Sequence, residues 1–224
     1  GTTEFSQYLK GEADFRYYRQ FNSKNMLAGR FAFGLAVPFG FTSDVPYVKQ
    51  FYVGGPSSIR GWPARSLGPG GYEDVNFGVE NITNRLLFYQ TGDIKLEFSL
   101  EYRFDLFWLF KGAFFLDGGN VWTLQEDPDR CGSQFRFSRS GLPCTGEGRS
   151  FRGPFYQQLA LGTGFGLRLD LSYFIFRLDM GLRLRNPFPL HADNGSIREG
   201  DFWTDFADWN FRDINYNIGL GYPF

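Results

Sequence analysis

Two arginines, Arg60 and Arg65, lie in a stretch whose composition is unusual for a surface loop. Residues 51–72 are rich in glycine and proline, which permit tight turns and fix the backbone, yet they also include apolar side chains that need a packing surface. We expect such a loop to be ordered and to fold inward. Each guanidinium carried inside would need a carboxylate or carbonyl partner, so the chemistry indicated is charge-assisted hydrogen bonding. The apolar set is Phe51, Tyr52, Val53, Ile59, Trp62 and Leu67.

The remaining polar residues do not point to catalysis, to a metal site or to a cofactor. The chain has one histidine, His191, which we expect in an exposed loop, and no motif places a Ser/His/Asp set or a phosphate-binding loop. Two cysteines and one histidine are too few for a zinc site. Cys131 and Cys144 share one polar stretch, where a disulfide in an oxidising compartment is preferred over two free thiols. The sequence therefore favours a protein that is not an enzyme.

The composition indicates a β-barrel that spans a membrane. Aromatic residues make up 20% of the 224 residues, with 28 Phe, and the chain also has 29 Gly. Aromatic girdles and glycine-bearing strands are typical of membrane barrels. No stretch approaches the ~20 consecutive apolar residues of a membrane helix. The net charge of −1 carries no basic signal for a nucleic-acid partner.

Apolar and polar side chains alternate with a period of two in segments of about ten residues, the length of a tilted membrane strand. In residues 94–104, Leu96 and Leu100 belong to an apolar face, whereas Glu97 and Glu101 belong to a polar face. One face is suited to lipid and the other to water or ion pairs. About seven strands are predicted, at 7–19, 27–37, 94–104, 111–122, 159–171, 174–184 and 214–224.

The same alternation assigns single side chains to a face. In residues 111–122 it sends Asp117 to the polar face and Trp122 to the lipid face. In residues 214–224 it places Tyr216, Tyr222 and Phe224 together on the apolar face, where aromatic residues form girdles at the membrane surface.

The connections between these segments alternate in length. Outer-membrane barrels have short periplasmic turns and long external loops, so the long connections are expected outside. Because seven strands are an odd number and fewer than the ~8 of the smallest bacterial barrels, we expect the C-terminal part of a larger barrel, with the first strands before Gly1. The short turns are predicted at 21–24, 107–108 and 172–173, and the long loops at 42–93, 125–156 and 187–213.

The motifs of the inward loop resemble a known family. The segment GGPSSIRGWPARSLGP, residues 54–69, is similar to the inward-folded sixth external loop of the BamA, TamA and Sam-type outer-membrane insertases, the bacterial surface antigen superfamily. The signature there is an Arg-Gly-aromatic tripeptide that follows an aliphatic residue. It corresponds to Ile59, Arg60, Gly61 and Trp62.

Three further segments extend the resemblance over nearly the whole chain. FSLEYRF (98–104) and FFLDGGNVW (114–122) resemble the two strands that follow the loop. YNIGLGYPF (216–224) resembles the C-terminal recognition signal of outer-membrane barrels, which ends on an aromatic residue.

The resemblance implies an all-β, transmembrane, antiparallel β-barrel of sixteen strands in the bacterial outer membrane, of which these are the last seven. We expect the family's periplasmic POTRA domains and first strands to be missing from this chain. The resemblance also implies that Arg60 pairs inside the barrel with Glu101 and Asp117, which would lock the loop in place.

The family mechanism implies a lateral seam between the first and last strands, where unfolded outer-membrane protein clients are inserted. The other implied partners are the lipid bilayer, the missing strands and POTRA domains, and accessory lipoproteins or periplasmic proteins. The seam and C-terminal signal would involve Tyr216, Gly219, Gly221, Tyr222 and Phe224.

Several alternatives stay open. The ion pair of Arg60 could merely stabilise the barrel, and Tyr222 and Phe224 could be plain girdle residues. Three glycines, Gly162, Gly164 and Gly166, either let the loop approach the wall or only help a strand to curve. An assembly and insertion factor is preferred over a two-partner secretion translocase and over a passive porin or surface receptor. The other polar strand residues are interpreted as a general lumenal charge lattice: Glu97, Arg103, Arg168, Asp170, Arg177, Asp179, Arg183 and Arg185.

Overall fold

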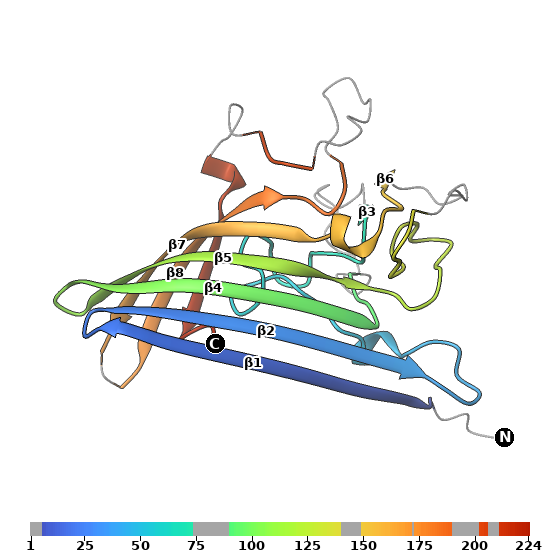
Figure 1. Cartoon of the computed structure of the whole chain (residues 1–224), viewed down its shortest axis with the longest axis horizontal. Coiled ribbons are helices and arrows are strands. Elements are labelled where there is room, and N and C mark those ends of the chain that lie inside the picture. The colour runs from blue at the N-terminus through green and yellow to red at the C-terminus, as the bar shows by residue number, and fades with distance from the viewer. Residues whose placement is uncertain (1–5, 74–89, 140–148, 172, 190–201, 206–210) are drawn as a thin grey trace, which may run out of the picture.

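Seven strands form one antiparallel sheet that curves around an inward-folded loop (Figure 1). The computed structural model describes residues 6–73, 90–139, 149–171, 173–189, 202–205 and 211–224. The strands lie in chain order, β1-β2-β4-β5-β7-β8-β9, so the predicted all-β antiparallel fold is confirmed. Their bounds are Tyr8–Asn22 (β1), Asn25–Pro38 (β2), Ile94–Phe107 (β4), Phe110–Trp122 (β5), Ala160–Asp170 (β7), Ile175–Arg185 (β8) and Asn215–Leu220 (β9).

The strands are amphipathic, as their alternation predicts. In β4, Leu100 and Tyr102 are 45% and 40% exposed on the outer face, while Glu101 between them is fully buried on the inner face. An aromatic row crosses β4, β5 and β7 on the outside, where the rings of Phe104, Phe114 and Phe165 follow one another at 5.5 and 5.4 Å between centroids. The outer face is therefore suited to lipid.

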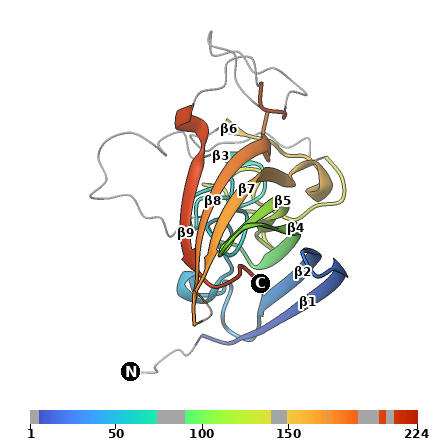
Figure 2. The same ribbon diagram turned by 90° about the vertical axis from the view of Figure 1, so that its left-hand side faces the viewer.

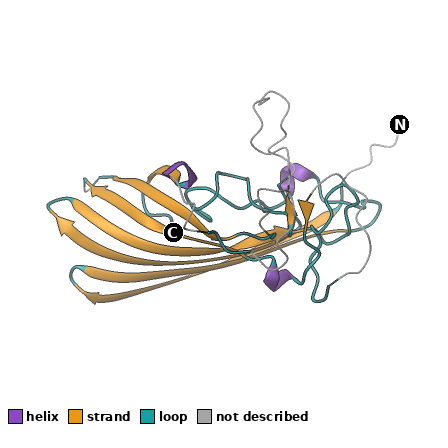
Figure 3. Ribbon diagram, turned by 90° about the horizontal axis from the view of Figure 1, so that it is seen from above, coloured by secondary structure: helices purple, strands orange, loops and turns teal. Residues whose placement is uncertain are grey.

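Tight turns and long connections lie at opposite ends of the strands (Figure 3). The turns of the β1–β2 and β4–β5 hairpins fall close to their predicted places, and Ser172 of the third predicted turn lies outside the described residues. Among the long connections, β3 (Tyr72–Glu73) pairs with β6 (Arg149–Ser150), a pairing too short for alternation to reveal. Single 3-10 turns are found at Tyr47–Lys49 (η1), Phe155–Gln157 (η3) and Phe211–Asp213 (η4). Across the described ranges, no helix has the length and apolar character to cross a membrane.

Residues 51–72 lie on the concave side of the sheet, as expected (Figure 2). Their buried side chains form one apolar cluster with small residues of the sheet, among them Ala36, Val121 and Ala160. The expected burial of Tyr52 is wrong, because its ring is 47% exposed beneath the Arg65 guanidinium. The loop members of the cluster are Phe51, Val53, Ile59, Trp62 and Leu67.

Trp122 does not face lipid as the alternation predicts but is fully buried. Its indole Nε1 donates to Gln158 Oε1 at 2.8 Å. Phe135 and Phe155 meet its ring edge-on, at 5.4 and 6.2 Å between centroids. The prediction fails because the connection after β5 folds back and covers the end of the strand.

The C-terminal tail also departs from its predicted face. β9 ends at Leu220, and Gly221 adopts a φ of 77°, which a glycine adopts readily and which turns the chain away from the strand direction. Tyr222 and Phe224 then lie against the Arg103 guanidinium, 4.2 and 5.5 Å from the ring centroids. Phe224 is buried against the inner face, so its expected place on the outer face is wrong; Tyr216 is exposed on the outer face.

Candidate functional site

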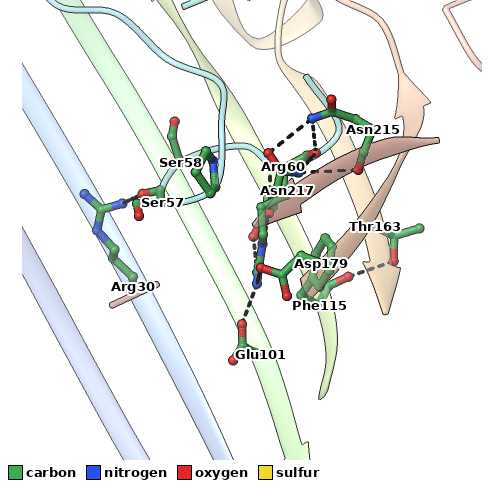
Figure 4. Close-up of polar contacts among 12 residues, drawn as sticks. Arg30, Ser57, Ser58, Arg60, Glu101, Phe115, Thr163, Asp179, Asn215 and Asn217 are labelled. Atoms are coloured by element: carbon green, nitrogen blue, oxygen red, sulfur yellow. Dashed lines mark hydrogen bonds and ion pairs between the residues drawn. The ribbon is translucent and has the colours of Figure 1, made fainter. Parts of the chain in front are cut away.

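Arg60 is the centre of a buried ion-pair cluster on the inner face of the sheet (Figure 4). Its Nε and Nη2 donate to the two carboxylate oxygens of Asp117 on β5, at 2.7 and 2.8 Å. Its Nη1 donates to Glu101 Oε2 on β4 at 2.6 Å. The backbone N–H of Arg60 also donates to Asp117 Oδ2, at 3.1 Å. The structure thus brings together the three residues that the motif singles out, and Asp117 fixes both the side chain and the backbone of the loop.

The Phe115 ring supports the guanidinium of Arg60 from one side. The Cζ atom of Arg60 lies 3.6 Å from the ring centroid, a cation–π contact in a desolvated setting. Gly164 on the neighbouring strand β7 makes room for this ring, since a Cβ at that position would collide with it. The planar guanidinium therefore has hydrogen bonds in its plane and an aromatic ring on its face.

Glu101 is shared between the loop and the sheet. Besides Arg60, it pairs with Arg103 Nε of its own strand at 2.7 Å and with Arg168 Nη2 of β7 at 2.9 Å. A carboxylate with fully buried oxygens gains from several donors, because each one offsets part of its desolvation. The bonds of Asp117 described here go to Arg60 of the loop, whereas Glu101 also pairs with two arginines of the sheet.

Asp179 on β8 adds a third carboxylate that the motif does not identify. Its oxygens lie 3.7 Å from Arg60 Nη1, 3.3 Å from Arg168 Nη2 and 3.1 Å from Arg177 Nε. Gly166 leaves space for this contact, because a Cβ there would collide with Arg168 and Asp179. Alternation places Asp179 on the polar face, but only the fold brings it to Arg60. Members of the predicted charge lattice are thus part of the site itself.

The loop backbone lies directly against β7 and β8. Gly162 and Gly61 face each other, and a Cβ at Gly162 would lie 3.4 Å from the Gly61 nitrogen. A Cβ at Gly181 would collide with the Arg60 carbonyl oxygen. Of the three glycines considered in the sequence, Gly162 backs the loop itself, whereas a Cβ at Gly164 would collide with the Met180 carbonyl oxygen of β8 and with the Phe115 ring, and one at Gly166 would collide with side chains.

Polar contacts hold the loop on either side of Arg60. On β2, Arg30 Nη1 donates to the Ser57 carbonyl at 3.1 Å (Figure 4). On β8, Arg183 Nε donates to the Gly61 carbonyl at 3.2 Å, and its guanidinium lies 5.4 Å from the Trp62 ring centroid. The motif residues are therefore fixed from both flanks.

Arg65 does not enter the interior, contrary to the expectation for both loop arginines. Its side chain is exposed, and its guanidinium lies 4.2 Å from the centroid of the Tyr52 ring. Arg65 has a φ of 60°, in a tight turn that directs the chain back after Trp62. The two arginines have the same chemistry, but Arg60 is buried among carboxylates, whereas the turn at Arg65 leaves its side chain exposed.

Two asparagines of the last strand complete the site, and sequence analysis missed them. The Nδ2 atoms of Asn215 and Asn217 both donate to the Arg60 carbonyl oxygen, each at 2.9 Å (Figure 4). Alternation places them on the inward face of β9, but no motif signals their shared acceptor.

The other predicted residues lie away from this cluster. Cys131 is buried and disulfide-bonded, while Cys144 and His191 lie outside the described residues. Gly219 lies on the inner side of β9 beside the Arg177 guanidinium. Within the described part of the chain, no group of three or more His, Cys, Asp or Glu side chains is arranged to hold a metal ion.

Chemically, the arrangement is suited to holding a segment in place. Its carboxylates are directed at arginines and at a backbone N–H. The site joins the loop to strands β4, β5, β8 and β9, which span most of the sheet. Opening it would expose or unpair several buried charges at once.

Comparison with known proteins finds relatives both by sequence and by fold. Two curated relatives are each described as outer membrane protein assembly factor BamA. The protein from Nitratidesulfovibrio vulgaris is 36% identical over 62 residues, which is 28% of this chain and 8% of that protein. The protein from Neisseria meningitidis serogroup B is 29% identical over 107 residues, 45% of this chain and 12% of that protein. The matched regions therefore span a small part of those relatives.

A solved structure shares the fold. The crystal structure of BamA from Haemophilus ducreyi lacking POTRA domains 1–3 superposes with a TM-score of 0.56 and 16% sequence identity. It covers 96% of this chain, and this chain covers 35% of it. The Omp85 superfamily domain matches residues 2–198, nearly the whole chain. The chain therefore belongs to the Omp85 superfamily of bacterial outer-membrane β-barrel proteins.

Proposed function

We propose that this chain is the barrel portion of a factor that assembles or inserts β-barrel proteins in the bacterial outer membrane. The observation that carries the proposal is the buried grip of Glu101 and Asp117 on Arg60, which holds the loop motif against the inner face of the sheet. The two BamA relatives, described as assembly factors, favour assembly over dedicated secretion and over a passive pore. The proposed role is mechanical and not enzymatic.

The grip on Arg60 is needed because an ordered loop is entropically costly. Fixing each residue costs about 1–2 kcal/mol of backbone entropy, and glycine loses the most. The apolar cluster and the charge-assisted bonds offset this cost together. Removing the Arg60 side chain would take the guanidinium partner from the buried Asp117 carboxylate and one of three arginines from Glu101, at about 3–5 kcal/mol, so the loop would be released.

The proposed seam lies at β9. This strand pairs with β8 over the six residues Asn215–Leu220, whereas β8 itself has eleven residues. A short edge strand is easier to separate, and an unpaired edge can accept a client strand by β-augmentation. In this proposal the locked loop supports the inner face of the sheet while the edge strand β9 separates from its partner strand and pairs with a client strand.

The first experiment compares Arg60→Ala with Arg65→Ala in the full-length protein. The two arginines lie in the same loop, but only Arg60 is buried among carboxylates. Arg60→Ala is expected to lower the rate at which a purified β-barrel client is inserted into lipid vesicles that contain the factor, by about tenfold or more. Arg65→Ala is expected to stay within about twofold of the parent.

A conservative substitution sharpens this experiment. Arg60→Lys keeps the charge but cannot reproduce the fork to Asp117 together with the bond to Glu101, so an intermediate rate is expected. Equal insertion rates for Arg60→Ala and the parent would contradict the proposal. Export of one soluble substrate without client insertion would instead support a secretion translocase.

A further inference from the structure

The last strand of the sheet contacts the loop as well as its neighbouring strand. Within the described residues, β9 pairs with β8 alone, and its inward face carries Asn215 and Asn217. Both side-chain amides donate to one atom, the Arg60 carbonyl oxygen, at 2.9 Å each. A carbonyl oxygen has two lone pairs, so the two amides saturate it.

The same region shows a second contact between the loop and the end of the sheet. Arg177 on β8 donates from Nη2 to the Pro56 carbonyl of the loop at 2.9 Å. Its guanidinium passes over Gly219 of β9, where a Cβ would collide with it. Arg177 therefore lies between the loop and the last strand, beside the two asparagines.

We infer that Asn215 and Asn217 are positioning residues that tie β9 to the inward loop, so that the strand is fixed only while the loop is locked by Arg60. The side chain of Arg60 is held by β4 and β5, and its carbonyl holds β9. One residue thus connects the middle of the sheet to its edge. The inference rests on the proposed function, in which β9 is the strand at the seam, and it adds how that strand is held.

The test is hydrogen exchange of residues 215–220, followed by mass spectrometry on the full-length protein in lipid vesicles. Asn215→Ala combined with Asn217→Ala is expected to speed exchange of these amides about tenfold, while peptides from β5 keep their rates. Tyr216→Ala is the matched control, because Tyr216 lies between the two asparagines on the outward, exposed face. Its effect is expected to stay within about twofold.

A double-mutant comparison separates the tie from a role confined to β9. In an Arg60→Ala background the loop is released, so the asparagine substitutions should add almost nothing to the exchange rate of 215–220. Wild-type exchange in the double asparagine variant would overturn the inference, as would an undiminished effect in the Arg60→Ala background. Should the double variant fail to fold, as judged by heat-modifiable electrophoretic mobility, the single variants carry the same test.

The exchange measurement does not depend on client insertion. If Arg60→Ala speeds exchange of β9 but leaves insertion unchanged, the tie stands and the proposed function fails. If insertion falls while exchange of β9 is insensitive to both asparagines, the tie fails and the proposed function stands.

Discussion

Arg60 reaches its carboxylates only because the residues around it leave room. Its carbonyl faces Gly181 on β8, its guanidinium rests on Phe115, and both carboxylate partners are buried beside it. Charge-assisted bonds are sensitive to small displacements, since their energy falls steeply once the geometry is lost. A substitution that only shifts the loop backbone should therefore weaken the ion pairs of Arg60, although it removes no charged group.

Gly181→Ala tests this argument at the residue scale. The added Cβ collides with the Arg60 carbonyl oxygen, so the loop must shift, at a cost of about 1–3 kcal/mol in the free energy of unfolding. Denaturant titration in lipid vesicles measures this cost. Gly11→Ala on β1 is the control, because nothing lies within 4 Å of its added Cβ, and its effect should stay below about 0.5 kcal/mol. Equal stability of the two variants would contradict the argument.

At the scale of elements, one buried amide holds together the described parts of the connection after β5, residues 123–139 and 149–159. Gln158 is fully buried and joins this connection to β5: its Oε1 accepts from Trp122, and its Nε2 donates to the carbonyls of Gly132 and Phe151 at 3.0 and 2.8 Å. One side-chain amide therefore bonds to three groups from separate segments. The aromatic rings around Trp122 pack over this centre.

Trp122→Phe removes one donor from this element and keeps most of its apolar area. The Gln158 Oε1 would lose its donor in a buried site, so the free energy of unfolding should fall by about 1–3 kcal/mol. Limited proteolysis should then cut the connection after β5 earlier. Trp108→Phe is the matched control, since Trp108 is 85% exposed in a turn, and its stability should be unchanged. Identical cleavage of the two variants would argue against the role of Gln158.

Alternation predicts the strands and the faces of their middle residues well, because side-chain direction in a strand depends only on the backbone. It places Glu101 and Asp117 on the inner face, and the loop motif names their partner. It fails where another segment covers or turns the strand, as at Trp122 and at Gly221. It also cannot reveal the tie at Asn217, because the acceptor is a backbone carbonyl that any residue at position 60 would supply.

At the scale of the whole molecule, the usual distribution of polarity is reversed. The outer face of the sheet is apolar and exposed, buried ion pairs lie on its inner face, and among the described residues the apolar cluster around the loop lies where the loop meets the sheet. Such a molecule is stable only if lipid covers the outer face. The stability cost of an outer-face charge should therefore depend on its depth in the bilayer.

Leu100→Arg and Leu106→Arg test this dependence. Both leucines lie on β4 and are exposed to a similar extent, 45% and 44%, but Leu100 is in the middle of the strand and Leu106 is near the turn. Arginine at the bilayer midplane costs about 2–4 kcal/mol, and about 0–1 near the interface. Denaturant titration in lipid vesicles should give a clearly larger loss for Leu100→Arg. Equal losses would mean that β4 does not cross the bilayer.

The sequence separations within the Arg60 site determine when it can form. From Arg60, its bonds reach Glu101 after 41 residues, Asp117 after 57 and Asn217 after 157. Contacts between distant parts of a chain form slowly, because the intervening polypeptide must first be brought together at an entropic cost. The final bonds to Arg60 therefore await the arrival of the last strand, and a folding intermediate that lacks this strand would have an incompletely fastened loop.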